Sequence, residues 1–365
     1  MKNYLNFESE IKDLESEIEK LKDPFNQSGL SKVDTEKISK TQEQLDAKLK
    51  LIYSNLDPWQ TTMVARHEDR PRSKFFIENL FDDFIPLSGD RYYGEDKSVL
   101  TGFAKFNNQS VLVIGQEKGD DLDSRIERNF GMMRPEGYRK TIRLMELADK
   151  FKIPIISFID TPGAYPGVGA EERGQAEAIA KSIECCMKLK VLTLAIVIGE
   201  GGSGGAIALA SSSKVIMLEN AIYSVISPEG CATILWRDPK KMLDAAKAMK
   251  LSARDLLKLN VIDEIIDEPV GGAHRDKNLV LESVRKSINQ NLEQFRDKSA
   301  DEIFIDRKNK FLKIGRSKGF MSDLENLSSL KSKNNNFELI IKYKKTLSLL
   351  AGIVIFLTTL LIVLL

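Results

Sequence analysis

Residues 191–206 read VLTLAIVIGEGGSGGA, and residues 153–169 read IPIISFIDTPGAYPGVG. Each stretch is an apolar run that predicts a buried strand, followed by a glycine-dense turn. The stretch 153–169 comes before the stretch 191–206 in the chain. Glycine is used where the backbone must approach a ligand closely or adopt a positive φ. Backbone N–H groups at such a turn, beside a helix N-terminus, can bind an anion or a developing oxyanion. The pair of turns therefore predicts a site whose chemistry is performed by the main chain.

Strands and helices alternate on both sides of these turns. Two apolar stretches, 98–107 and 109–119, predict a hairpin that turns at Asn107-Asn108. Further strands are expected at 214–218 and 221–227, and helices at 137–151, 171–190, 245–250 and 252–260. This order predicts an α/β fold, a sheet covered by helices, with direct strand-to-strand steps that a simple βαβ winding lacks.

Three charged residues follow the turn at 162–169. Glu171 and Glu172 are expected to start the helix 171–190, because the helix dipole favours carboxylates in the first turn. Arg173 is either a member of a surface ion pair or a ligand contact.

The first 60 residues have the pattern of a separate helical arm. Ile11, Leu14, Ile18 and Leu21 mark the apolar face of one helix, and a stripe from residue 38 to residue 56 marks a second. A breaker, DPFNQSG, lies between them. We therefore expect a helical hairpin over residues 1–60, followed by a folded domain over 61–320.

The C-terminal end has a different composition. Residues 321–346 are mostly polar and predict a tether, and residues 347–365 carry no charge. A helix of that length reaches roughly 28 Å, close to the thickness of a bilayer's hydrocarbon core. Lys342, Lys344 and Lys345 precede it and favour a cytoplasmic or stromal position for the folded part. We expect a transmembrane tail anchor, with a buried or oligomerisation helix as the alternative.

The overall composition argues against several classes of function. The 54 Lys and Arg residues balance the 53 Asp and Glu residues, so no global field recruits nucleic acid. The three cysteines, Cys185, Cys186 and Cys231, form neither a disulfide framework nor a C-x-x-C pair, so no metal is expected in this chain. Their sparse use indicates a reducing compartment.

The glycine turn after residue 198 also fits a dinucleotide-binding motif. Gly199, Gly201 and Gly204 match G-x-G-x-x-G, and Glu219 lies at the spacing of the acid that binds ribose in such folds. The helix that follows is short, however, and this interpretation leaves the turn at 162–169 unexplained.

The same turn fits a serine hydrolase as well. Residues 201–205, GGSGG, match the G-x-S-x-G elbow around Ser203. His274 with Asp263 or Asp267 could complete a triad, although His274 lies in a glycine-rich loop without a strand before it.

Six stretches carry a resemblance when they are taken together. They are RPRSKFFIENLFDDFIPLSGDR (70–91), RNFGMMRPEGYRK (128–140), FIDTPGAYPGVGAEERGQ (158–175), GEGGSGGA (199–206), YSVISPEGCATILW (223–236) and EPVGGAHR (268–275). In this order and spacing they resemble the carboxyltransferase α subunit of multi-subunit acetyl-CoA carboxylase, over roughly residues 60–320.

The resemblance implies a crotonase (ClpP-like) fold, which is a ββα superhelix, and an enzyme that acts with partners. The implied reaction transfers a carboxyl group from carboxybiotin to acetyl-CoA and gives malonyl-CoA, the first committed step of fatty acid synthesis. Biotin is expected on a biotin carboxyl carrier protein rather than on this chain, and ATP is expected to be used by a partner biotin carboxylase. A β subunit with a four-cysteine zinc ribbon is expected to complete an α2β2 assembly.

The resemblance also assigns residues by motif match. The amides of Gly204 and Gly205 are expected to form the oxyanion hole for the ureido oxygen of biotin. The residues expected to contact substrate around them are Gly163, Ala164, Tyr165, Gly202 and Ser203. Gly163 and Ala164 could line the biotin or CoA channel, and Tyr165 is either a biotin contact or a structural aromatic.

The chain departs from the family at its end, because members usually stop near the position of Gly319-Phe320. The tether and the apolar segment 347–365 therefore predict an enzyme of the cytoplasm, or of a plastid stroma, that is tethered to a membrane. A non-catalytic homologue held by the same tail is the remaining alternative, and the intact glycine turns argue against it.

Overall fold

The computed structural model describes residues 3–23 and 35–315 of the chain. The chain divides into one compact unit over Met1–Ile314 and another over Gly315–Leu365. Most of the predicted breaker, the tether 321–346 and the apolar segment 347–365 lie outside the described residues. Within the described ranges, no helix is both long and apolar enough to cross a bilayer.

A single eight-stranded sheet forms the centre of the described chain. Its strands are β1 (Asp82–Pro86), β2 (Val99–Phe106), β3 (Gln109–Gln116), β4 (Ile155–Thr161), β5 (Thr193–Gly202), β6 (Lys214–Leu218), β7 (Ile222–Ser224) and β8 (Glu264–Ile266). The spatial order is β1-β2-β3-β4-β5-β6-β8, and β7 pairs with the end of β5. β1, β2 and β3 are antiparallel neighbours, and the pairs from β3 onward are parallel. The predicted α/β fold with direct strand-to-strand steps is confirmed.

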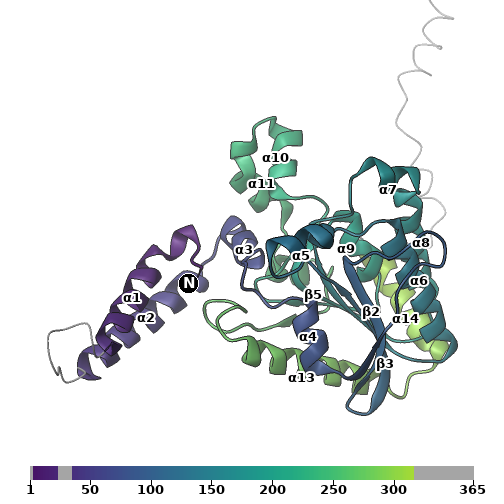
Figure 1. The fold of residues 1–365 in the computed structure, drawn as a ribbon, viewed down its shortest axis with the longest axis horizontal. Coiled ribbons are helices and arrows are strands. Elements are labelled where there is room, and N and C mark those ends of the chain that lie inside the picture. The colour runs from purple at the N-terminus through teal and green to yellow at the C-terminus, as the bar shows by residue number, and fades with distance from the viewer. Residues whose placement is uncertain (1–2, 24–34, 316–365) are drawn as a thin grey trace, which may run out of the picture. The chain divides into compact units, whose positions relative to one another are not determined.

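The described residues also form fourteen α-helices. They are α1 (Ser9–Lys22), α2 (Thr35–Tyr53), α3 (Pro58–Ala65), α4 (Ser73–Leu80), α5 (Leu122–Glu127), α6 (Pro135–Lys150), α7 (Val168–Glu172), α8 (Gln175–Lys188), α9 (Ser203–Ala210), α10 (Pro228–Trp236), α11 (Met242–Met249), α12 (Ala253–Lys258), α13 (Lys277–Phe295) and α14 (Ala300–Lys313), with short 3-10 turns at Asn6–Glu8, Asn129–Gly131 and Pro239–Lys241. α6, α8, α9 and α14 form one packed group, and α4 packs with α13 in another (Figure 1).

Both middle strands are buried along their whole length. Every residue of β4 and of β5 is buried, which explains why these strands are continuous apolar runs rather than alternating ones. Phe158 of β4 stacks on Phe76 of α4 with 5.4 Å between the ring centroids. The core therefore fixes the two strands that deliver the glycine turns.

The predicted hairpin is confirmed in place and register. Phe106 pairs with Gln109, and the two residues between them, Asn107 and Asn108, have φ values of 48° and 62°. Asparagine tolerates this left-handed conformation, which a two-residue hairpin requires at both positions.

Two local predictions were wrong. The predicted helix 171–190 is broken, because Gly174 adopts a φ of 80° between α7 and α8. Glu171 lies in the first turn of a helix as expected, but that helix is the short α7, which begins at Val168. The strand β5 also runs past the first glycines to Gly202, since residues 200–202 pair with β7. The strand therefore leads directly into α9 at Ser203.

The N-terminal helices form the predicted hairpin. α1 and α2 pack through Ile11, Ile18, Leu45 and Leu49. The helix α3 instead packs on β5, β7 and α11, so the expected boundary at residue 60 falls inside a helix of the body.

Candidate active site

The two glycine turns meet at one edge of the sheet. β4 and β5 are parallel neighbours, so their carboxyl ends lie side by side, which is where open α/β sheets commonly bind ligands. A Cβ on Gly205 would lie 2.7 Å from the carbonyl carbon of Gly163 and 3.0 Å from the nitrogen of Ala164. A Cβ on Gly202 would lie 2.2 Å from the carbonyl oxygen of Pro162. Glycine at both positions lets the two turns touch through their backbones.

The helix α9 begins at this contact. The first amides of an α-helix have no acceptor within the helix, and here these are the N–H groups of Ser203, Gly204 and Gly205. No side chain caps them from the N-cap position, Gly202. Ser203 is exposed, Gly204 half-buried and Gly205 buried, so the donors run from solvent into the contact between the turns. Uncapped amides at a helix start can bind an anion.

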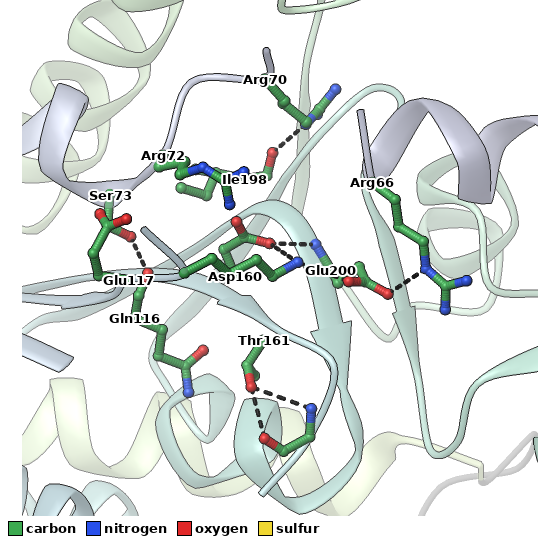
Figure 2. Close-up of polar contacts among 12 residues, drawn as sticks. Arg66, Arg70, Arg72, Ser73, Gln116, Glu117, Asp160, Thr161, Ile198 and Glu200 are labelled. Atoms are coloured by element: carbon green, nitrogen blue, oxygen red, sulfur yellow. Dashed lines mark hydrogen bonds and ion pairs between the residues drawn. The ribbon is translucent and has the colours of Figure 1, made fainter. Parts of the chain in front are cut away.

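The turn after β4 is held by its own hydrogen bonds. Thr161 Oγ1 donates to the carbonyl of Gly163 at 2.7 Å and accepts from the Gly163 amide at 3.1 Å (Figure 2). The Tyr165 amide donates to the carbonyl of Met133, and the Arg134 guanidinium lies 4.6 Å from the centre of the Tyr165 ring. The Gly163 amide is thus already engaged, whereas Ala164 faces Gly205 directly.

A buried charged cluster lies between the ends of β4 and β5. Lys118 Nζ contacts Asp160 at 2.8 Å and Glu200 at 2.7 Å, and the Glu200 amide donates to the Asp160 carboxylate at 2.9 Å (Figure 2). Arg66 bridges Glu200 and Glu229, each at 2.6 Å. The cluster ties the two turns to each other and to the first turn of α10.

The charges in this cluster hold one another ionised. Burial alone would raise the pKa of Glu200, but Lys118 and Arg66 lower it to about 2. Burial likewise disfavours charge on Lys118, and Asp160 and Glu200 more than offset it, so its pKa is raised. Lys118 and Glu200 therefore stay charged at neutral pH.

Two glutamine side chains donate hydrogen bonds to carbonyl groups in and around the two turns. Gln116, at the end of β3, donates through Nε2 to the carbonyl of Gly205 at 2.8 Å. Gln175, in the first turn of α8, donates to the carbonyls of Met133 and Tyr165 at 2.8 and 3.0 Å. Both glutamines are buried.

Sequence reasoning missed Lys118, Gln116, Arg66, Asp160 and Glu200. Asp160 and Glu200 lie in the stretches 153–169 and 191–206, each a carboxylate at the end of an apolar run, and Lys118 lies two residues after the end of β3. A lone charge at the buried end of a parallel strand was the available signal.

Arg173, which follows the turn at 162–169, contacts Tyr93. Arg173 pairs with Glu136 at 2.5 Å, and its guanidinium lies 4.3 Å from the centre of the Tyr93 ring. The expected ion pair is therefore present, with a buried carboxylate as its partner.

The residues of the alternative motifs do not gather into a site. Asp263 Oδ2 accepts from the Val215 amide at 2.7 Å and from Lys310 at 2.9 Å, near the start of β6, whereas Ser203 follows the carboxyl end of β5. His274 stacks on His67 with 3.7 Å between ring centroids. Ser203 does adopt a φ of 52°, as in a strained elbow, but the geometry supplies it with no triad from the predicted partners.

Glu219 serves a structural contact. Its carboxylate accepts from Arg254 at 2.7 Å. An acid that binds ribose would instead face a ligand at the switch point of the sheet.

The three cysteines are buried thiols. Burial raises the pKa of Cys186 to about 12. Within residues 3–23 and 35–315, no group of three or more His, Cys, Asp or Glu side chains is placed to hold a metal ion.

Known proteins resemble this chain in sequence and in fold. A sequence model of the family described as "Acetyl co-enzyme A carboxylase carboxyltransferase-like" matches residues 4–315. The acetyl-coenzyme A carboxylase carboxyl transferase subunit alpha of Pelagibacter ubique (strain HTCC1062) is 75% identical over 361 residues, which is 98% of each chain. The protein of the same name from Chelativorans sp. (strain BNC1) is 53% identical over 317 residues, which is 87% of this chain and 100% of its own length.

A solved structure shares the fold at low identity. The crystal structure of transcarboxylase 12S with methylmalonyl-coenzyme A and methylmalonic acid bound has a TM-score of 0.52 and 19% identity over 63% of this chain. The match spans 42% of that longer chain, so it bears on the fold alone. The two chains therefore share a fold over the matched part.

Proposed function

This chain belongs to the acetyl-CoA carboxylase carboxyltransferase α-subunit family, and from that premise we propose how its site works. The family's reaction is carboxyl transfer to acetyl-CoA, which makes malonyl-CoA. In our proposal the amides of Gly204 and Gly205 are the oxyanion donors for the ureido oxygen of carboxybiotin. The supporting observation is the contact between the first turn of α9 and the Gly163–Ala164 peptide.

The residues present fit a biotin ureido group. The first turn of α9 presents amides without an acceptor in the helix, and the Gly163–Ala164 peptide approaches Gly205 so closely that no Cβ fits there. Carboxybiotin, when bound, would supply the carboxyl group as CO₂ and, once the CO₂ has left, the base that takes a proton from the acetyl-CoA methyl group before the carboxyl group is attached. The chain's own amides stabilise the negative charge that develops on the ureido oxygen, and each well-placed donor contributes about 3 kcal/mol. Ala164 and Tyr165 would border the biotin on the neighbouring turn, and Gly202 and Ser203 would border it at the helix start.

The charged cluster has a positioning role in this proposal. Lys118, Asp160 and Glu200 join the last residues of β4 and β5, so the two turns are held at a fixed separation. Preorganised donors need no rearrangement when charge develops, and that is the source of their effect. Their side chains do not need to touch the substrate.

Partner proteins complete the proposed enzyme. We propose a carboxyltransferase β subunit that carries a zinc ribbon and binds acetyl-CoA, in an α2β2 assembly. A biotin carboxyl carrier protein would deliver the biotin, and a biotin carboxylase would recharge it with ATP. The name "subunit alpha" of the relatives supports a second subunit.

The assignment is tested by substitution at Gly205. Gly205→Ala places a methyl group 2.7 Å from the Gly163 carbonyl carbon, so it must push the two turns apart. We expect kcat for malonyl-CoA/biocytin exchange, measured with the co-purified β subunit, to fall roughly 100-fold or more, the effect of losing one oxyanion donor. Gly204→Ala should cost less, because its Cβ meets only the Ile179 side chain, at 3.4 Å.

Gly94→Ala is the matched control. A Cβ at Gly94 meets no atom within 4 Å, so activity and thermal stability should match those of the unaltered chain. Full exchange activity in a folded Gly205→Ala variant would contradict the assignment of Gly204 and Gly205 as oxyanion donors.

The C-terminal extension supports a second, separate proposal. Residues 347–365 carry no charge. The Pelagibacter ubique relative aligns with 98% of this chain, whereas the Chelativorans relative aligns over 317 residues, which is close to the length of the family region 4–315. We propose that this segment anchors the enzyme in a membrane, with the folded part on the cytoplasmic side. Carbonate-washed membranes should retain the full chain and release a chain that lacks residues 347–365. Equal release of both would contradict the anchor.

A further inference from the structure

The chain contains two histidines, and their rings stack on each other. The ring centroids of His67 and His274 are 3.7 Å apart, and the ring planes differ by 8°. His67 follows the end of α3 and is 5% exposed, and His274 lies in the glycine-rich loop before α13. The proposed reaction uses neither ring, so the pair is a buried feature beside the charged cluster that the mechanism leaves unexplained.

Hydrogen bonds fix the tautomer of His67. The Asp69 amide donates to Nδ1 at 3.2 Å, so this nitrogen is an acceptor and carries no proton. The proton is therefore on Nε2, which donates to the carbonyl of Asn3 at 3.1 Å. One neutral tautomer satisfies both partners, so His67 joins the turn after α3 to the first residues of the chain.

Asn3 binds this turn through its side chain as well. Its Nδ2 donates to Glu68 at 3.3 Å and to Asp69 at 3.4 Å. Together with His67, three consecutive residues of the turn are thus bound to a single residue near the N-terminus. We call residues 3–8 together with α1 and α2 the N-terminal arm. These bonds attach the start of the arm to the turn.

The residues around this turn also reach the strand that ends at the candidate site. Arg66, directly before His67, contacts Glu200 at 2.6 Å, and Arg70 donates to the Ile198 carbonyl at 2.6 Å (Figure 2). Both acceptors belong to β5, which leads directly into α9. The segment is therefore held by the N-terminal arm on one side and by the strand before the proposed oxyanion donors on the other.

The loop of His274 makes a parallel pair of connections. Arg275, the next residue, contacts Glu8 of the arm at 3.2 Å. Glu268, at the start of the same loop, accepts from Arg70. The stacked rings thus pack together two loops, each of which binds the arm at one point and the body of the fold at another.

We propose that the N-terminal arm is a positioning element of the carboxyltransferase site and that it acts through His67. The arm fixes the turn after α3, and Arg66 of that turn fixes the Glu200 carboxylate. Glu200, with Lys118 and Asp160, in turn holds the two glycine turns at a fixed separation. Such a role of the arm rests on the positioning role proposed above for the charged cluster.

Two substitutions at His67 separate the contact with the arm from the local turn. Asn has an amide oxygen near the position of Nδ1, so His67→Asn keeps an acceptor for the Asp69 amide but does not reach Asn3. Gln has an amide nitrogen near the position of Nε2, so His67→Gln keeps the donor to Asn3. Both variants lose the ring and its stack, so a difference between them reports the contact with the arm.

We expect a loss of turnover in one of these variants only. His67→Asn should lower kcat for malonyl-CoA/biocytin exchange about tenfold with KM nearly unchanged, because the geometry of the donors changes and ligand binding does not. His67→Gln should keep kcat within about twofold of the unaltered chain. The variants are assayed with the co-purified β subunit at 25 °C, and Tm is measured for each.

A shortened chain tests the other partner of the same hydrogen bond. A chain that lacks residues 2–7 keeps α1 but has lost Asn3, so its kcat should fall by about the same factor as in His67→Asn. Combining the two changes should bring no further loss, because both remove one contact. Lys40→Gln is the control on the arm, since Lys40 forms an exposed pair with Glu36 within α2.

Two results would overturn the role of the arm. One is an unchanged kcat in His67→Asn or in the shortened chain, even where Tm falls. The other is an equal loss in His67→Asn and His67→Gln, which would assign the effect to the ring stack. The shortened chain leaves position 67 intact, so the test stays decisive if His67→Asn does not fold. An inactive Gly205→Ala beside a fully active His67→Asn would leave the oxyanion assignment standing and reject the arm.

Discussion

At the scale of single residues, His274 shows what burial does to a titratable side chain. Burial, followed by the nearby His67, lowers the pKa of His274 to about 3. Arg275, Arg70 and Lys277 also face it and act in the same direction. In the folded chain this ring therefore stays neutral down to about pH 3.

This residue should make the fold sensitive to mild acid. The unfolded chain protonates His274 below about pH 6.5, while the folded chain does so only near pH 3, so stability is lost as the pH falls through that window. From pH 7 to pH 5 the loss is about 2 kcal/mol. Urea unfolding should show this slope in the unaltered chain and a smaller one in His274→Gln. Identical slopes would exclude the residue as its cause.

At the scale of elements, Gln116 links one strand to the helix that carries the proposed donors. Its amide binds the Gly205 carbonyl, which lies in the first turn of α9. Gln116→Met keeps the size of the side chain and removes the Nε2 donor, so the first turn of α9 should lose its fixed orientation. We expect kcat for carboxyl exchange to fall about tenfold with KM nearly unchanged, because the effect is on the donor geometry and not on ligand binding.

A purely structural role would give a different pattern. The lost hydrogen bond costs about 1 kcal/mol of stability in either case. If kcat at 25 °C stays unchanged while only the unfolding midpoint falls, Gln116 supports the fold and not the site. Asn79→Ala serves as the control, since Asn79 makes an exposed bond within α4.

The same scale shows what the sequence can and cannot predict. The hairpin at Asn107-Asn108 and the strands β4 and β5 follow from local turn chemistry and continuous apolar runs, and these were predicted. The helices α13 and α14 were not named, because their contacts are tertiary. Arg307 of α14, for example, is 1% exposed and donates to the carbonyls of Cys186, Leu189 and Val191. No local pattern announces such a long-range contact.

The candidate site, like the fold, could be predicted from the sequence only in part. The glycine turns could be predicted because glycine marks close backbone approach. The pairing of Lys118 with Asp160 and Glu200 could not, since it depends on three strands being neighbours in the sheet. The extension of β5 to Gly202 likewise depends on β7, which lies twenty residues further along.

At the scale of the whole molecule, the N-terminal hairpin is joined to the body by buried charges. Arg275 contacts Glu15 at 2.5 Å and Glu8 at 3.2 Å, and Tyr53 donates to Glu8 at 2.8 Å. Arg275→Gln leaves these carboxylates without their cation, so unfolding in urea should become easier by about 3 kcal/mol. Arg285→Gln, at an exposed pair with Glu282, should change it by less than about 1 kcal/mol. Equal midpoints for the two variants would contradict the role of Arg275.

The contact between the two glycine turns also bears on how this chain can change over time. Main-chain donors are encoded by no particular side chain, so ordinary substitutions cannot delete them. A substitution can instead disturb the close backbone contact beside these donors, because at Gly202 and Gly205 not even a methyl group fits. Inherited variation should therefore be nearly forbidden at these two positions.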